Sequence, residues 1–166
     1  MSREQPSFSL VTICPTFVFG PVIQPLSSID KLNTSSQRIY DFIAGNYTQA
    51  IPDTGISFFL WIDVRDLATA HVNAMEFPNI TNRRYLLTEG YFCNREIYEI
   101  IKKRFPEYEE QLPVDDGQSG GFPPEGIYRF DNNNATNELG LSYRSLESSV
   151  VDTVQSIQQL QQRVGS

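Results

Sequence analysis

The sequence predicts one α/β domain over residues 1–166, made of part of a doubly wound parallel sheet and a small mixed α/β lobe. Three observations support this fold class. A run near the N-terminus is apolar on both faces, which is typical of a parallel strand inside a covered sheet. Parallel strands need crossover helices, and helix-forming segments follow this run. Finally, 166 residues, 40% of them hydrophobic, suffice for one core and are too few for two ordinary domains.

The first predicted strand covers Phe8 to Cys14, where strand-forming residues dominate. Pro15 ends its pairing, because proline has no N–H to donate to a ladder. Only seven residues precede this strand, so the chain is expected to start in the middle of a sheet. The uncovered strand edge at residues 8–13 is therefore predicted to favour self-association or pairing with another chain.

The following segments alternate between helix and strand. Apolar residues at helical spacing predict a helix from about Leu32 to Ile43, which Gly45 ends. Ile56–Val64 is predicted as a strand or extended segment, and Asp63 as the cap of a helix that reaches Met75. The remaining predictions are a strand at Arg84–Thr88, a helix at Asn94–Phe105, a loop at Asp115–Gly126, a short strand at Tyr128–Phe130, a short helix from Asp131 or Asn132 to Gly140, and a last helix capped by Ser145.

Charge and cysteine content narrow the class of partner. The net charge of −7 and the pI near 4.7 disfavour nucleic acid and anionic membrane surfaces, which both need a basic face. Cys14 and Cys93 do not form a disulfide framework, and free thiols fit a reducing, cytoplasmic setting. No window approaches 18 apolar residues. One histidine and two distant cysteines also argue against a zinc site, so no metal is expected.

Three stretches occur in an informative order: C-P-T-F-V-F-G-P at 14–21, W-I-D-V-R-D-L-A-T-A-H at 61–71 and N-E-L-G-L-S-Y-R-S-L-E-S-S-V-V-D-T-V at 137–154. Together they resemble the C-terminal, substrate-binding half of extended short-chain dehydrogenase/reductases, which have Rossmann-type sheets. The nearest group is the NADPH-dependent aldehyde and ketone reductases, such as methylglyoxal and dihydroflavonol reductases. The resemblance extends over nearly the whole chain and implies NADPH as cofactor and a small carbonyl compound as substrate.

The resemblance also implies roles for individual residues. Pro15 and Val18 would lie against the nicotinamide ring, and Phe17 would face the substrate. Ser35, in the segment L-N-T-S at 32–35, would lie near the nicotinamide end of the cofactor. The physical interpretation agrees in part, because ligands of open α/β folds bind at the carboxyl ends of the parallel strands.

Two family features are absent from the sequence. It contains no G-x-G-x-x-G, the turn whose backbone amides receive a pyrophosphate. The family's catalytic tyrosine and lysine precede the strand that corresponds to Phe8–Cys14, so no catalytic residue is predicted here. The chain is therefore interpreted as the substrate-binding half of a carbonyl reductase, inactive and weak in NADPH binding by itself. The alternative is a catalytically silent remnant that serves as a small-molecule-binding or protein-interaction module.

Four other candidates have structural explanations that we favour. Tyr98 and Lys102 form a Tyr-x-x-x-Lys pair, but helical spacing places Tyr98 at the border of the core face and Lys102 in water. His71 shares a predicted apolar face with Leu67, Val72 and Met75, so we expect a core histidine.

The remaining two candidates are charged segments. Asp63, Arg65 and Asp66 are explained as helix-capping carboxylates with an intervening arginine. The loop D-D-G-Q-S-G-G at 115–121 carries carboxylates that would repel phosphate, so it is predicted as a surface loop rather than a phosphate cradle.

Overall fold

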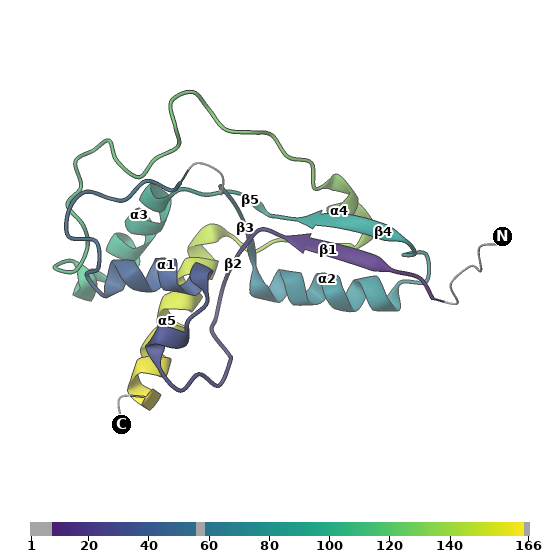
Figure 1. Cartoon of the computed structure of the whole chain (residues 1–166), viewed down its shortest axis with the longest axis horizontal. Helices are drawn as coiled ribbons and strands as arrows, with labels where there is room; N and C mark the ends of the chain where they lie inside the picture. The colour runs from purple at the N-terminus through teal and green to yellow at the C-terminus, as the bar shows by residue number, and fades with distance from the viewer. Residues whose placement is uncertain (1–7, 56–58, 165–166) are drawn as a thin grey trace, which may run out of the picture.

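The computed structural model describes residues 8–55 and 59–164 and has an α/β fold, as predicted (Figure 1). Its elements, in chain order, are β1 (Val11–Pro15), β2 (Phe17–Phe19), the 3₁₀ helix η1 (Ile29–Lys31), α1 (Thr34–Ile43), β3 (Leu60–Asp63), α2 (Val64–Glu76), β4 (Arg83–Leu87), β5 (Gly90–Tyr91), α3 (Asn94–Arg104), the 3₁₀ helix η2 (Pro106–Tyr108), α4 (Asn133–Glu138) and α5 (Leu146–Val164).

The strands form two small sheets. In one, β1 pairs with β4 in parallel; in the other, β3 lies between the parallel strand β2 and the antiparallel strand β5. The apolar run at the N-terminus therefore contributes to both sheets, and the chain changes sheet at Thr16. Within the described ranges β1 has β4 as its one strand neighbour. The strand begins at Val11 rather than at Phe8, and the Phe8 and Leu10 side chains are 70% and 61% exposed.

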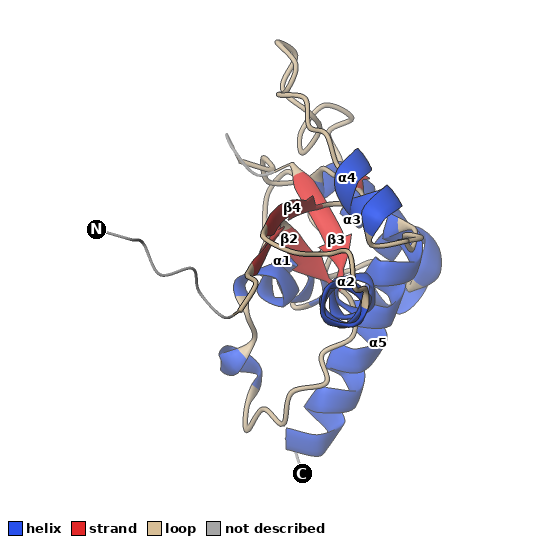
Figure 2. Ribbon diagram, turned by 90° about the vertical axis from the view of Figure 1, so that its right-hand side faces the viewer, coloured by secondary structure: helices blue, strands red, loops and turns tan. Residues whose placement is uncertain are grey.

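Two hydrophobic cores lie on opposite sides of Thr16, where the chain passes from one sheet to the other. The first is enclosed by α1, α3 and α5 and contains Phe19, Phe42, Trp61, Ile101 and Val154. The second lies between α2, α4 and the β1–β4 pair and contains Ile62, Ala70, Tyr85, Leu87 and Leu139. Figure 2 shows α2 end-on beside the strands, with the long loop before α4 standing out beyond them.

Capping residues place the helix starts where the sequence predicts them. The Asp63 carboxylate accepts a hydrogen bond from the Arg65 N–H at 2.8 Å and caps α2. The Ser145 hydroxyl accepts from the Ser148 N–H at 3.3 Å at the start of α5. The strand predicted at Ile56–Val64 is confirmed as β3 from Leu60 onward, while residues 56–58 lie outside the described residues.

The short strand predicted at Tyr128–Phe130 is wrong, since this segment is a loop. Its polar groups are satisfied in another way. The Tyr128 carbonyl accepts a hydrogen bond from the Tyr91 hydroxyl at 2.7 Å, and the Tyr128 hydroxyl accepts one from the Phe59 N–H at 3.3 Å. The hydroxyl and the carbonyl of Tyr128 thus hold this segment in place, instead of the hydrogen bonds of the expected strand.

The prediction of a core histidine is also wrong. His71 is exposed, with its Nδ1 2.8 Å from the Leu67 carbonyl oxygen, and its neighbours Val72 and Met75 are 45% and 82% exposed. The second core covers the side of α2 that carries Ala70, and it leaves the next side uncovered. The periodicity of the sequence correctly predicted an apolar face of α2, but periodicity alone does not show whether another segment covers that face.

None of the helices in the described ranges has the length and hydropathy of a membrane span. No group of histidine, cysteine and carboxylate side chains within these ranges is arranged to hold a metal ion.

Candidate functional site

The change of sheet at Thr16 creates a cavity at the carboxyl end of β1. The Thr16 N–H and hydroxyl both donate to the Leu87 carbonyl oxygen at 3.3 Å, which fastens the turn to the end of β4. The cavity has a volume of about 470 Å³. We call it the turn cavity; it is lined by Pro15, Thr16, Phe17, Thr34, Ser35, Leu60 and Tyr128. Its position at the strand ends is the usual ligand position of open α/β folds.

Helix α1 brings Ser35 to this turn. Asn33 caps the helix by accepting a hydrogen bond from the Ser36 N–H at 2.8 Å, which places Ser35 in the first turn of α1. The Ser35 hydroxyl then accepts a hydrogen bond from the Val18 N–H at 3.3 Å. Residues 17 positions apart in the chain are thereby joined at the mouth of the turn cavity.

The structure brings together three of the four residues predicted from the sequence. Pro15, Phe17 and Ser35 line the turn cavity, whereas Val18 is bonded to Ser35 through its backbone and does not line the cavity. Strand alternation is the reason: Phe17 packs against the first core and Val18 against the second. Contacts of Pro15, Val18 and Ser35 with a cofactor, and of Phe17 with a substrate, stay predictions.

An arginine that the sequence analysis did not single out supports Phe17. The Arg38 guanidinium carbon lies 5.1 Å from the centroid of the Phe17 ring and 5.9 Å from that of Phe92. Its Nη1 donates to the Asn94 Oδ1 at 2.8 Å, and burial is the main cause that lowers the Arg38 pKa. Helical spacing is the signal that could have revealed it, since position 38 lies one turn after Ser35 on α1.

The predicted surface loop at 115–126 forms the wall of a second cavity of about 450 Å³. We call this the loop cavity; it is lined by residues 53–55, Phe59, Gln118 and residues 120–128. Arg95 anchors the loop, because its Nη1 donates to Asp115 at 2.9 Å and its main-chain N–H donates to the Gly120 carbonyl at 2.9 Å. Tyr128 lines both cavities, so the two share one wall.

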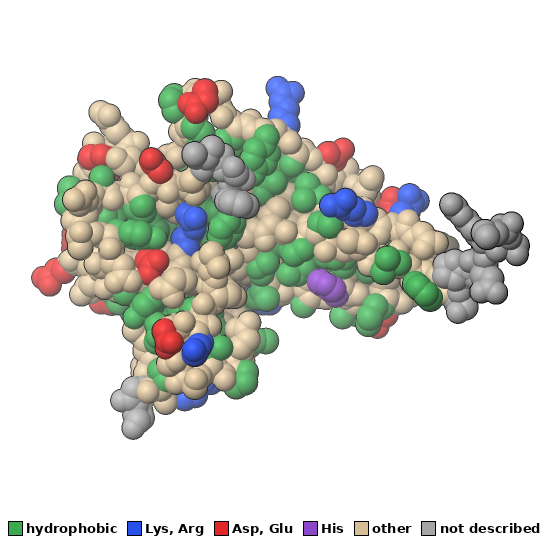
Figure 3. Space-filling model, viewed as in Figure 1, with side chains coloured by type: hydrophobic (Ala, Val, Ile, Leu, Met, Phe, Trp, Pro, Cys, Tyr) green, Lys and Arg blue, Asp and Glu red, His purple; other side chains and the backbone are tan. Residues whose placement is uncertain are grey.

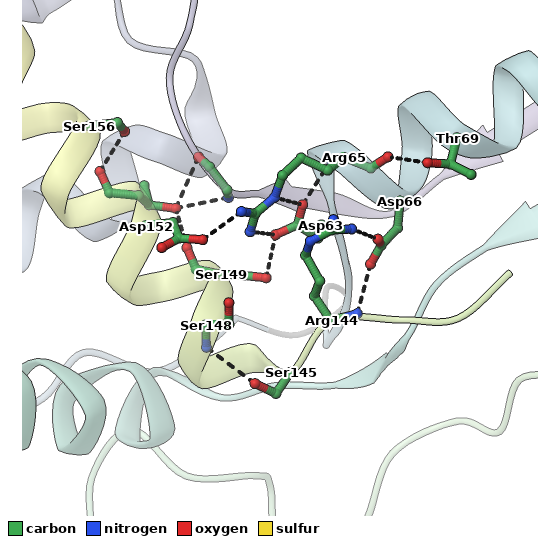
Figure 4. A network of polar contacts seen from close by, with 12 residues as sticks. Asp63, Arg65, Asp66, Thr69, Arg144, Ser145, Ser148, Ser149, Asp152 and Ser156 are labelled. Atoms are coloured by element: carbon green, nitrogen blue, oxygen red, sulfur yellow. Dashed lines mark hydrogen bonds and ion pairs between the residues drawn. The ribbon is translucent and has the colours of Figure 1, made fainter.

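The carboxylates at the end of β3 and in the first turn of α2 form structural ion pairs with arginines, and we call the group around Asp63 the clamp (Figure 4). Asp63 is fully buried and accepts hydrogen bonds from the Arg65 Nε at 2.8 Å, the Arg65 Nη2 at 2.7 Å and the Ser149 hydroxyl at 2.6 Å. Burial raises the pKa of Asp63, but these hydrogen bonds outweigh it and hold that pKa below its ordinary value. Arg65 also donates to Asp152 at 2.6 Å, so the clamp ties α2 to α5. This geometry supports the structural interpretation of Asp63 and Arg65.

Asp66 makes a second connection of the same kind. It is buried and accepts a hydrogen bond from the Arg144 N–H at 2.8 Å, and the Arg144 guanidinium also contacts its carboxylate. Arg144 immediately precedes the cap of α5. The two carboxylates therefore orient α2 and α5 around the end of β3.

Tyr98 of the Tyr-x-x-x-Lys pair lies in the first core, and neither Tyr98 nor Lys102 lines the turn cavity or the loop cavity. The expected partly wet position of Tyr98 is wrong: its side chain is 4% exposed, because the buried face of α3 is wider than one apolar stripe. Lys102 is exposed as predicted, with its ammonium 5.4 Å from the Tyr98 ring centroid. This placement supports the interpretation of the pair as structural.

No protein-family model matches the chain. It is 38% identical over 157 residues to the ketoreductase azaE of Aspergillus niger, covering 95% of this chain and 46% of that relative. It is 31% identical over 157 residues to a putative NADPH-dependent methylglyoxal reductase of Candida albicans, covering 95% of this chain and 45% of the relative.

A solved structure extends the likeness to the fold. The crystal structure of Gre2 from Candida albicans in complex with NADPH matches with a TM-score of 0.75 at 35% identity, over 95% of this chain and 46% of that one. The chain thus spans about half the length of the curated relatives and of the solved structure that it matches.

Proposed function

We infer that this chain, which is related along nearly its whole length to the NADPH-dependent reductases of the extended short-chain dehydrogenase/reductase group, is the C-terminal, substrate-binding half of an aldehyde or ketone reductase. The turn cavity carries this inference. Pro15, Phe17 and Ser35 come from three separate elements, β1, β2 and α1, and meet around one space. Its walls combine an aromatic ring, a proline and hydroxyl groups, which suits a small carbonyl compound beside a nicotinamide ring.

Residues outside this sequence would supply the rest of the catalytic machinery. The sequence holds no glycine-rich fingerprint for a pyrophosphate, and the tyrosine of its one Tyr-x-x-x-Lys pair is packed in the first core while the lysine is exposed. When bound, NADPH would supply the hydride. Within this chain, Pro15 and Val18 would support the nicotinamide ring, Ser35 would hold its end, and Phe17 would orient the substrate.

An uncovered apolar face offers a place for the other half. β1 and α2 border a groove of about 600 Å³, in which the lining residues Leu10, Met75 and Phe77 are 61%, 82% and 38% exposed. Figure 3 shows hydrophobic side chains gathered around the single histidine on this face. Large exposed apolar patches mark interaction sites, and β1 also presents the edge of a strand. A dinucleotide-binding half would cover the groove and extend the sheet from β1.

Complementation tests this proposal. The chain alone is expected to show no carbonyl reductase activity and to bind NADPH more weakly than about 1 mM, a binding free energy of only about 4 kcal/mol. Co-expression with the part of the Aspergillus niger ketoreductase that the match leaves uncovered is expected to restore NADPH oxidation by aldehydes. In that complex, Phe17→Ala should change the ratio of kcat/KM between a small and a branched aldehyde more than it changes Tm. Steady NADPH oxidation by the isolated chain would contradict the proposal.

The edge of β1 also favours a second candidate, a catalytically silent binding or interaction module. No residue from Phe8 to Phe19 is charged, and natural proteins usually protect an exposed strand edge with charge. Complementation separates the two candidates. A module would bind a partner through β1 without restoring NADPH oxidation in any combination of halves.

A further inference from the structure

We propose that the substrate site is bipartite: the turn cavity takes the carbonyl group, the loop cavity takes an aryl group attached to it, and Tyr128 sets the distance between the two. This inference rests on the proposed function and names the substrate class, a neutral ketone or aldehyde with an aromatic substituent. Tyr128 would be a specificity-determining residue, a role that its loop position does not reveal in the sequence.

The shared wall is the first observation. The turn cavity, of about 470 Å³, and the loop cavity, of about 450 Å³, both border Tyr128. The consecutive residues Phe59 and Leu60 also divide between them, with Phe59 lining the loop cavity and Leu60 the turn cavity. The turn cavity and the loop cavity are therefore adjacent both at the start of β3 and at Tyr128.

The walls of the loop cavity are aromatic. Phe59 lies 5.9 Å from Phe122 and 6.4 Å from Tyr128, ring centroid to centroid, at interplanar angles of 56° and 49°. Tyr91 extends the cluster, at 6.4 Å from Phe122 and 4.9 Å from Phe130. Phe122 and Tyr128 stay 42% and 44% exposed, so a planar apolar group that enters the cavity removes aromatic surface from water.

Charge excludes an anionic substituent. The described lining of the loop cavity contains Asp53 and Glu125 and no lysine or arginine. A carboxylate or phosphate placed there would meet like charge without a cation to offset it. A neutral aryl group fits both the aromatic walls and the sign of the charge.

Tyr128 is held in place from both ends. Its hydroxyl accepts a hydrogen bond from the Phe59 N–H at 3.3 Å and its carbonyl accepts one from the Tyr91 hydroxyl at 2.7 Å, so the residue is tied both to the segment just before β3 and to β5. The preceding turn is closed by a 2.9 Å hydrogen bond from the Gly126 N–H to the Pro123 carbonyl. The wall between the cavities is thus positioned by hydrogen bonds before any ligand arrives.

Ligand-observed NMR titration of the whole chain tests the inference with three probes: 2-butanone, 4-phenyl-2-butanone and the anion 4-phenylbutanoate. The phenyl ketone is expected to bind roughly tenfold more tightly than butanone, which corresponds to about 1.4 kcal/mol, and more tightly than the anion. Phe122→Ala should remove most of this preference and leave butanone binding unchanged. Phe77→Ala, an exposed phenylalanine beside the β1–α2 groove, is the matched control and should keep the preference.

Two further variants test Tyr128 itself. Tyr128→Phe retains the ring and should keep the preference for the phenyl ketone, whereas Tyr128→Ala merges the cavities and should reduce it. Circular dichroism checks that each variant is folded. Equal binding of butanone and the phenyl ketone would overturn the bipartite site and leave the proposed function standing. Binding of neither ketone by the folded chain would also overturn the bipartite site, whereas the proposed function is overturned separately by the complementation experiment. Tighter binding of the anion would refute the charge argument.

Discussion

Replacing Arg65 by methionine should destabilise the fold, because it leaves the Asp63 carboxylate buried without its guanidinium. Asp63 is fully buried, while the Arg65 side chain is 33% exposed. The variant keeps the main-chain N–H of residue 65 and the Ser149 hydroxyl as donors, and loses two guanidinium hydrogen bonds and the ion pair to Asp152. Breaking a buried pair costs about 3–5 kcal/mol, and partial exposure of Arg65 reduces our expectation to about 2–4 kcal/mol.

Urea denaturation measures this loss. The single tryptophan, Trp61, is fully buried in β3, two residues before Asp63, so its fluorescence reports unfolding next to the clamp. With a slope near 2 kcal/mol per molar urea, the transition midpoint should fall by about 1–2 M. Arg83→Met is the matched control: Arg83 is 58% exposed and 3.8 Å from Glu138, so its loss should change stability by less than about 0.5 kcal/mol.

The pH dependence of the difference distinguishes lost charge pairing from lost packing. In the wild type the Asp63 pKa lies below its ordinary value of 3.8, so its contribution to stability is present above that value and is lost as the pH falls through the lower folded pKa. In the variant, burial without the guanidinium raises the folded pKa, so the carboxylate costs stability at neutral pH. The difference between the two proteins should therefore be largest near neutral pH and shrink as Asp63 becomes protonated in the variant. An equal difference at acidic and neutral pH, or a loss no larger than that of the control, would refute the reasoning.

Three further predictions concern the edge of β1, the exposed histidine and a glycine with positive φ. Light scattering is expected to show self-association of the wild type at micromolar concentration, and Thr12→Lys, which places a charge at an exposed position of β1, should reduce it. A wild type that is monomeric at all concentrations would show that the edge is already covered. His71→Ala should change the free energy of unfolding by less than about 0.5 kcal/mol, because the ring is exposed, and a large drop in Tm would restore the core assignment. Gly120→Ala should lower the free energy of unfolding, measured by thermal denaturation, by about 1–3 kcal/mol, because φ is +77° and an added Cβ would clash with the Ile51 Cγ2. Gly117→Ala is the control: its φ is +73° but the space around it is open, so the difference between the two variants isolates the clash from the backbone strain.

Local chemistry accounts for what the sequence predicted correctly. Asp63 and Ser145 placed the starts of α2 and α5 because a capping side chain acts on backbone groups two or three residues away. Pro15 marked the end of β1 because it lacks an N–H. The resemblance of short motifs singled out Pro15, Phe17 and Ser35, which the fold gathers around the turn cavity.

Only the tertiary structure decided which apolar faces are covered. Periodicity placed His71 on an apolar side of α2, yet no described element packs over it, and it left Tyr98 at a border that α3 in fact buries. The loop at Tyr128 was misread for the same reason: its partners, Phe59 and Tyr91, lie 69 and 37 residues away. The periodicity of a helix or strand shows which side chains share one face of that element, whereas burial and cavities depend on segments distant in sequence. The caps, the strand end and the site motifs were therefore determined by the sequence itself, and the open face of α2, the buried Tyr98 and the wall between the two cavities were decided by packing.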